Sequence, residues 1–242
     1  MSVRRKSARR GGPRRALLLV AIGLLSAGGF YLVVFSDLFT VREVELIGGE
    51  LLAGERPDLP TGGNIFFWRP PADLVNAPRV SGFSIERQYW QRKIVLRLEA
   101  RDRYAIWCVE GQDTCLWVDS AGIAFSEAPN LEGVSNLHLV RDISTRTLSP
   151  GDKVLGEELF PYLVTAFTFL DTIDADVERF TVDELKFKEA VAEIKEGPDI
   201  YFSLSVDPGF ALGVVQSLRQ SGDWDTIKYL DLRVPNRAYY SG

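Results

Sequence analysis

The sequence predicts an α+β protein that is attached to a membrane by an N-terminal transmembrane helix. Three observations predict this fold class: an uncharged apolar run near the N-terminus, a short block of strand and helix patterns after it, and a longer block dominated by strands. The long block is expected to form a mostly antiparallel β domain with two helices. The predicted organisation is a basic tail (1–15), a transmembrane helix (16–35), a small α+β module (36–102) and the β domain (103–242).

The apolar run at residues 16–35 is long enough to cross a bilayer. It has 20 residues without a charge, and a helix rises about 1.5 Å per residue across a core of about 30 Å. The seven basic and no acidic side chains of residues 1–15 predict a cytoplasmic N-terminus and an extracytoplasmic body. The alternative is a cleaved signal peptide with Ser26-Ala27-Gly28 as its cleavage region. The run resumes beyond that point, so its length favours the anchor.

The body that follows the anchor is acidic. It holds all 33 Asp and Glu residues but only 21 of the 28 Lys and Arg residues. Nucleic acid binding needs a positive surface, so this composition argues against a nucleic acid partner.

The first module reads as strand, short helical segments, strand and strand. The first strand falls within residues 39–47 and ends at Gly48-Gly49; a gap in its alternation predicts a bulge or a start at Arg42. A short helix lies within 69–80, and two alternating strands follow at 83–90 and 93–101.

The second block contains more strands. Two helices are expected at 155–173, with Pro161 in the first turns or at a kink, and at 208–222. The expected strands are 104–109, 115–119, 123–125, 135–142, 177–184, 188–196, 199–207 and 227–234.

The two cysteines, Cys108 and Cys115, flank the turn of a predicted hairpin. An extracytoplasmic body permits disulfides, so a disulfide that closes this hairpin is favoured over two free thiols. A zinc site is not expected, because two cysteines and one distant histidine leave the tetrahedral site short of ligands.

No catalytic, cofactor, metal or small-molecule site is predicted. The single histidine, His138, lies in a strand pattern, where a packed or surface residue is the more common case. The acidic stretch 171–178 lacks the central Gly and terminal Glu of a calcium loop and reads as a solvated connection. The aromatic stretch 66–68 reads either as a hydrophobic plug of the first module, which is favoured, or as an exposed loop.

The last predicted strand raises the question of a partner. Its alternate residues Leu230, Leu232 and Val234 share one face. If the strand lies at the rim of its sheet, a partner segment can pair with its free backbone groups. On the other face, Arg233 is expected to hold a partner carboxylate, unless Asp231 and Arg233 pair with neighbours inside the sheet. The Tyr239-Tyr240 pair beyond it reads either as a partner contact or as a tail that folds back on the sheet.

Several motifs recur together in the same order as in one family. They include "F-x-V-x-x-V-x-L-x-G" from Phe39 to Gly48, "GGNIFFW", "APRVSGFSIERQYW", "KIVLRLEARDRYAIW", "LWVDSAGIAF" and "YLDLR". With the basic tail and single anchor, the chain resembles the FtsQ/DivIB family of bacterial cell-division proteins over nearly its whole length. It departs from the family at Trp90-Gln91, where Trp-Pro is common, and at Ala100-Arg101-Asp102-Arg103, where an acidic-basic pair followed by Pro is common. The cysteine pair is an addition to the usual pattern.

The resemblance implies a non-enzymatic scaffold of the division septum in the inner membrane. It implies a βααββ-like POTRA module at 36–102, the β domain at 103–242, and FtsB/FtsL-type partners held at the last strand. The expected partner-binding residues are Lys228, Tyr229, Leu230, Asp231, Leu232, Arg233 and Val234, with Tyr239 and Tyr240 beside them. Another POTRA-containing envelope assembly or secretion accessory protein, or an anchored wall-associated enzyme or sensor, is the alternative.

Overall fold

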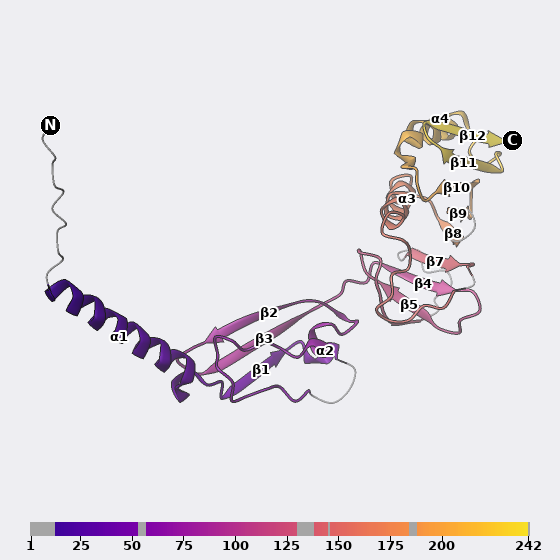
Figure 1. The fold of residues 1–242 in the computed structure, drawn as a ribbon. Coiled ribbons are helices and arrows are strands. Elements are labelled where there is room, and N and C mark those ends of the chain that lie inside the picture. The colour runs from indigo at the N-terminus through magenta and orange to yellow at the C-terminus, as the bar shows by residue number, and fades with distance from the viewer. Residues whose placement is uncertain (1–12, 53–56, 130–137, 145, 184–187, 242) are drawn as a thin grey trace, which may run out of the picture. The chain divides into compact units, whose positions relative to one another are not determined.

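A computed structural model describes residues 13–52, 57–129, 138–144, 146–183 and 188–241. The chain forms two compact units (Figure 1). The first unit contains residues 1–76 and 82–99, and the second contains residues 77–81 and 100–242. The expected α+β class is confirmed: the described part has an N-terminal apolar helix, a large mostly antiparallel sheet and four α-helices.

The first unit begins with helix α1 (Pro13–Phe35) and continues into a three-stranded sheet. One apolar span, Leu17–Phe35, has the length and composition to cross a membrane, as a transmembrane anchor or a signal sequence does. The sheet has the order β1-β3-β2, formed by β1 (Glu43–Ile47), β2 (Val80–Gln88) and β3 (Lys93–Ala100). The shorter elements are η1 (Asp37–Phe39), η2 (Gly49–Leu51) and α2 (Ala72–Val75).

The core of this small sheet follows the expected alternation of β3 at Ile94, Leu96 and Leu98, which are buried, but Val95, expected to face outward, is buried too, and Ala100, expected to face inward, is exposed. β1 pairs in parallel with β3, and Val44 lies opposite Ile94, which is fully buried. Ile65 and Trp68 are also buried, and the Trp68 indole donates a hydrogen bond of 2.7 Å to the Pro60 carbonyl. The plug prediction therefore holds for Trp68. It is wrong for Phe66 and Phe67, which are exposed.

The second unit is built on a nine-stranded sheet with the order β12-β11-β10-β9-β8-β7-β4-β5-β6. Its strands are β4 (Ala105–Val109), β5 (Cys115–Val118), β6 (Ala124–Ala128), β7 (His138–Asp142), β8 (Val177–Asp183), β9 (Glu189–Ile194), β10 (Asp199–Ser203), β11 (Tyr229–Val234) and β12 (Arg237–Ser241). Five neighbouring pairs are antiparallel and three are parallel (β4–β7, β7–β8 and β10–β11).

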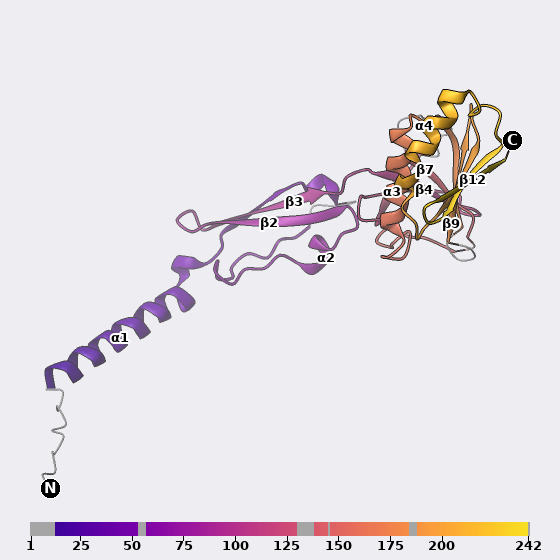
Figure 2. The ribbon, with the colours of Figure 1, turned by 90° about the horizontal axis from the view of Figure 1, so that it is seen from above.

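Two helices cover one face of this sheet (Figure 2). The other face, which we call the open face, has no helix in the described part of the chain, but it carries a smaller buried cluster of Ile106, Cys115, Trp117 and Phe125. Helix α3 (Phe160–Thr172) has Pro161 in its first turn, where the missing N–H costs no hydrogen bond. Helix α4 (Leu212–Ser221) follows η3 (Pro208–Ala211) and ends at Gly222, whose φ of 79° is left-handed. The main core lies between these helices and the sheet, and includes Trp107, Leu163, Phe202, Leu230 and Leu232.

The turn between β5 and β6 is shaped by Asp119 and Gly122. The buried Asp119 carboxylate accepts hydrogen bonds from the amides of Ala121 and Ile123 and from Arg101. Gly122 has φ +79°, and a Cβ there would lie 2.8 Å from the Phe160 ring. The position therefore requires glycine for both its backbone and its space.

Candidate partner-binding edge

The last strand of the chain is β12, and the sequence pattern did not reveal it. Pro235 and Asn236 form a two-residue turn, and Asn236 adopts a φ of 58°, which asparagine tolerates better than most residues. The chain then returns antiparallel to β11, with Leu230 opposite Tyr240 and Asp231 opposite Tyr239. The signal that could have found this strand is a turn dipeptide followed by two strand-favouring tyrosines.

The prediction that the strand ending at Val234 lies at the rim of the sheet is wrong. β11 is paired on both sides, in parallel with β10 and antiparallel with β12. The backbone of residues 229–234 is therefore used within the chain. Among the described residues, the rim strand on this side of the sheet is β12, with β11 as its one neighbour. In an antiparallel ladder, alternate backbone groups of such a strand point away from that neighbour.

The predicted contact residues of β11 divide between the two faces of the sheet. Leu230 and Leu232 are buried in the core, so they cannot contact a partner while the domain is folded. Tyr229 and Val234 keep 38% and 41% of their surface accessible, and Lys228 is also exposed. Only the exposed members can contribute side-chain contacts.

The two tyrosines of the rim strand are the most accessible aromatic residues of this region. Tyr239 is 47% exposed and Tyr240 is 54% exposed. Tyr239 lies opposite Asp231 and so belongs to the open face, whereas Tyr240 lies opposite the buried Leu230 and belongs to the helix-covered face. The tail does fold back as a strand, and both tyrosine rings remain available on its two faces.

The prediction that Arg233 is free for a partner carboxylate is wrong. Its guanidinium bonds both oxygens of Asp231 (2.9 and 2.6 Å) and both oxygens of Glu189 (3.0 and 2.9 Å). These side-chain bonds from Arg233 hold the pKa of Asp231 below its usual range. The same hydrogen bonds to the Asp231 carboxylate raise the pKa of Arg233. The pairing lies within the sheet, as the alternative interpretation expected.

An aromatic cluster lies beside this ion pair on the open face. Tyr201 and Tyr229 meet edge to face with ring centroids 6.2 Å apart, and Arg233 lies 5.3 Å from the centroid of the Tyr201 ring. Because the open face continues from these rings to Tyr239, the rim and the cluster form one surface. We call residues 237–241 with Tyr201 and Tyr229 the C-terminal edge surface.

The opposite rim of the sheet, at β6, is partly covered by the chain itself. The amide of Ala124 donates to the carbonyl of Asp152 at 2.9 Å, and the amide of Gly151 donates to the carbonyl of Ala124 at 2.7 Å. Ile123 also forms a bridge with Lys153. The first residues of that rim therefore have backbone partners.

His138 is a packed residue in a polar-aromatic cluster. Its ring stacks on Phe167 with centroids 4.1 Å apart, and its Nε2 lies 3.7 Å from an Asp171 oxygen. Burial lowers the pKa of His138, and the Asp171 carboxylate opposes this effect in part. Burial also raises the pKa of the neighbouring Tyr104, with a smaller contribution from Asp171.

The acidic stretch 171–178 does not gather into a metal site in the described part of the chain. Asp171 faces His138, and Asp176 pairs with Lys195 at 3.1 Å. Within the described residues, no group of three or more His, Cys, Asp or Glu side chains is placed to hold a metal ion.

The cysteines close the β4–β5 hairpin. Cys108 and Cys115 form a disulfide with their Cα atoms 4.3 Å apart. A polar cavity of about 580 Å³ lies next to it and is lined by Arg141, Arg179 and Glu193 among others. Arg179 and Glu193 pair with each other at 3.3 Å, so part of the charge in the cavity is already balanced.

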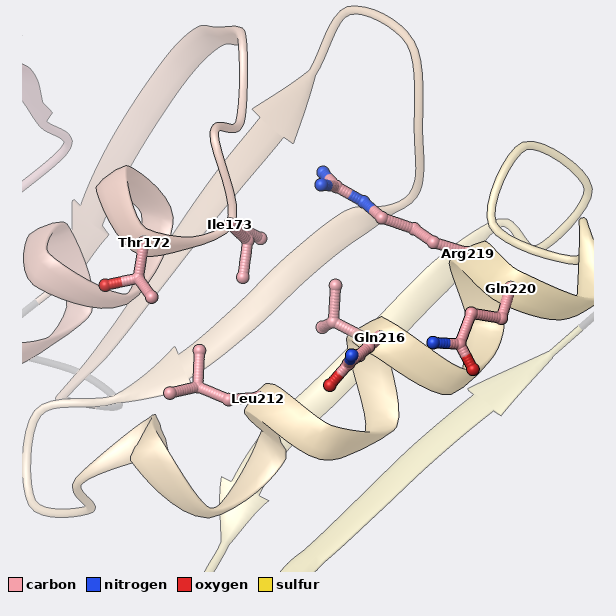
Figure 3. Close-up of a pocket in the computed structure, with 7 residues that line it drawn as sticks. Thr172, Ile173, Leu212, Gln216, Arg219 and Gln220 are labelled. Atoms are coloured by element: carbon pink, nitrogen blue, oxygen red, sulfur yellow. The ribbon is translucent and has the colours of Figure 1, made fainter.

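A second cavity lies between the end of α3 and α4 (Figure 3). It has a volume of about 440 Å³ and an apolar floor that includes Ile173 and Leu212. Gln216, Gln220 and Arg219 stand at its side, and the Arg219 guanidinium lies 5.0 Å from the Trp224 ring centroid. The lining residues include no acid, histidine or cysteine, and the one hydroxyl among them, on Thr172, donates to the Thr168 carbonyl at 2.6 Å.

The comparisons with known proteins add no relative. No family model matches this chain, and no curated protein matches it.

Proposed function

We propose that this chain is a membrane-anchored, non-enzymatic scaffold of the bacterial division machinery, of the FtsQ/DivIB type. In this proposal α1 is a single anchor in the inner membrane, with its N-terminus in the cytoplasm. The first unit is the POTRA module, and the second unit binds an FtsB/FtsL-type partner at the division septum. The proposal rests on the resemblance in motif order, which includes the "VDSAGIAF" and "YLDLR" stretches.

The observation that carries the binding proposal is the open rim at β12. A partner segment can add to it as a further strand, with main-chain hydrogen bonds that need little sequence specificity. The exposed rings of Tyr239 and Tyr240 then provide side-chain contacts on both faces. Tyrosine is enriched among the residues that contribute most to binding energy, which favours this surface.

The test is co-purification of the partner from the native envelope with the full chain and its variants. Substitution of both Tyr239 and Tyr240 by alanine is expected to weaken capture by about tenfold or more, because a central tyrosine contributes on the order of 1–2 kcal/mol. Removal of residues 235–242 is expected to abolish capture. The matched control is Phe83→Ala, an exposed aromatic residue of the first unit, which should leave capture unchanged.

Full capture by the chain that lacks residues 235–242 would reject the β12 edge as the binding site. Localisation separates the function from its alternatives. A fluorescent fusion should form a band at mid-cell, whereas a uniform envelope signal would favour a secretion or assembly accessory protein or a wall-associated enzyme.

A further inference from the structure

Large apolar side chains gather at one end of the first unit and remain exposed to solvent. They come from η1, from the loop before α2 and from the turn between β2 and β3. Leu38 is 65% exposed, Phe67 is 66% exposed and Trp90 is fully exposed. Phe66 and Tyr89, also exposed, stack with centroids 5.1 Å apart. Single exposed apolar residues need no explanation, but a contiguous group marks an interaction surface. We call Leu38, Phe66, Phe67, Tyr89 and Trp90 the aromatic base.

The aromatic base is fixed to the end of α1 by hydrogen bonds. The Asn64 side-chain amide donates to the carbonyls of Val33 and Val34, at 2.7 and 3.2 Å, and so satisfies two of the last carbonyls of the helix. The Arg92 guanidinium donates to the Thr40 carbonyl at 3.0 Å, and the Arg42 amide donates to the Arg92 carbonyl at 2.9 Å. Figures 1 and 2 both show the β2–β3 turn beside the C-terminal end of α1.

These bonds place the aromatic base at the depth where the helix leaves the hydrocarbon. The apolar span Leu17–Phe35 has 19 residues, which at about 1.5 Å each gives about 28 Å, close to the thickness of the bilayer core. Leu38 follows three residues after the span. The interfacial layer outside the core is several Å thick on each side, so side chains at this height lie within it.

We propose that the aromatic base is embedded in the lipid interface and gives the first unit a second attachment to the membrane. Tyrosine and tryptophan are enriched at this depth, because a ring can lie among the upper acyl chains while its polar atom meets the headgroups. This inference rests on the anchor in the proposed function and is independent of its division role. The occupant is the lipid bilayer to which α1 already belongs.

The local polar groups agree with this position. In the β2–β3 turn, the amide of Gln91 donates to Gln88 and the amide of Arg92 donates to Tyr89, so the turn brings satisfied backbone groups to the lipid. Asp37 in η1 carries a charge at the same end of the unit. A charge is tolerated among headgroups and costly in hydrocarbon, so the base lies at headgroup level.

The test uses tryptophan fluorescence of the full chain in phosphatidylcholine vesicles. The chain has five tryptophans, and Trp90 is exposed while Trp68, Trp107, Trp117 and Trp224 are buried. Lipids brominated near the top of the acyl chain should quench roughly one fifth of the emission, the share of one residue in five. Iodide in the aqueous phase should not quench this share of the emission, which comes from Trp90. In the Trp90→Phe variant, the lipid-dependent quenching should disappear.

A matched variant tests whether position or exposure alone is responsible. The double variant Trp90→Phe/Phe83→Trp moves the indole from the turn to an exposed position on β2. Phe83 lies five residues before the end of that strand, about 16 Å along it. It should be quenched by iodide and not by brominated lipid.

Two results would overturn the inference and distinguish it from the anchor. If Trp90 is quenched by iodide and not by brominated lipid while the chain resists carbonate extraction, the interfacial attachment is rejected and the anchor stands. If carbonate releases the chain and Trp90 is not quenched by lipid, both are rejected. Because the vesicles contain no other protein, lipid quenching also excludes a protein as the required occupant of this surface.

Discussion

Replacement of Asp142 by alanine is expected to destabilise the second unit strongly. Asp142 is fully buried at the end of β7. Its carboxylate accepts hydrogen bonds from the Trp107 indole (2.9 Å), from the amide and hydroxyl of Ser144 (3.0 and 2.5 Å) and from Arg146 (2.9 and 2.6 Å). This one carboxylate therefore joins β4, β7 and the loop that follows β7.

The magnitude follows from what the substitution leaves behind. The buried Trp107 N–H loses its acceptor, at a cost of about 1–3 kcal/mol. The Arg146 side chain, 20% exposed, loses its anionic partner. Breaking one partner of a buried pair costs about 3–5 kcal/mol in total. With a urea slope of about 2 kcal/mol/M, the unfolding midpoint should fall by about 2 M.

The assay is urea unfolding of the full chain in detergent, followed by far-UV circular dichroism. Asp176→Ala is the matched control, because Asp176 pairs with Lys195 on the surface of the same unit, with side chains 54% and 49% exposed. That change should alter the free energy of unfolding by less than about 1 kcal/mol. Equal midpoint shifts for Asp142→Ala and Asp176→Ala would refute the reasoning that burial sets the cost.

Three further changes test other parts of the second unit. Folding lowers the pKa of His138, so the free energy of unfolding should decrease as the pH drops below about 6.5. His138→Gln should flatten that decrease in urea melts at a series of pH values. Replacing Cys108 and Cys115 by serine should lower the free energy of unfolding by about 2.5 kcal/mol, because the disulfide closes a short loop. By mass spectrometry, the unreduced wild-type protein should be lighter than its reduced form by the mass of two hydrogens. Leu232→Ala should cost about 2–5 kcal/mol in the same melts, and an unchanged midpoint would contradict its burial.

The local elements of this fold were largely predictable, because each carries its own periodicity. The alternation of β3 locates the buried Ile94 and Leu96, although Val95 on the opposite face is buried as well. α4 is framed by Pro208 and Gly222, as helix boundaries predict. The hairpin that brings Cys108 close to Cys115 is also a local feature.

The order of the strands was not predictable from local pattern, and the error at the rim follows from this. Parallel neighbours such as β4 and β7 are separated by many residues, so no local period encodes their pairing. β12 has only five residues, and its burial pattern lacks strict alternation. Pro235 looked like the end of the sheet, although it opens the turn that adds another strand. The pairing of Arg233 with Glu189 was likewise not predictable from local pattern, because Glu189 lies on a strand 44 residues away.

The difference between the two rims of the large sheet bears on how a partner would bind. The rim at β6 has backbone partners from residues 151–152, whereas β12 has a single neighbour and a single basic side chain, Arg237, at its start. Proteins commonly protect free edges with charges, proline or covering loops. β12 has one charged residue, Arg237, at its start and Pro235 just before it, whereas the exposed Tyr239 and Tyr240 along the rest of the strand favour a specific partner. A five-residue strand extends only about 17 Å and offers few main-chain bonds. Tight binding at β12 would therefore need the rings of the C-terminal edge surface as well as its backbone. For this reason, replacing Tyr239 and Tyr240 by alanine should weaken capture of the partner even when the strand itself is intact.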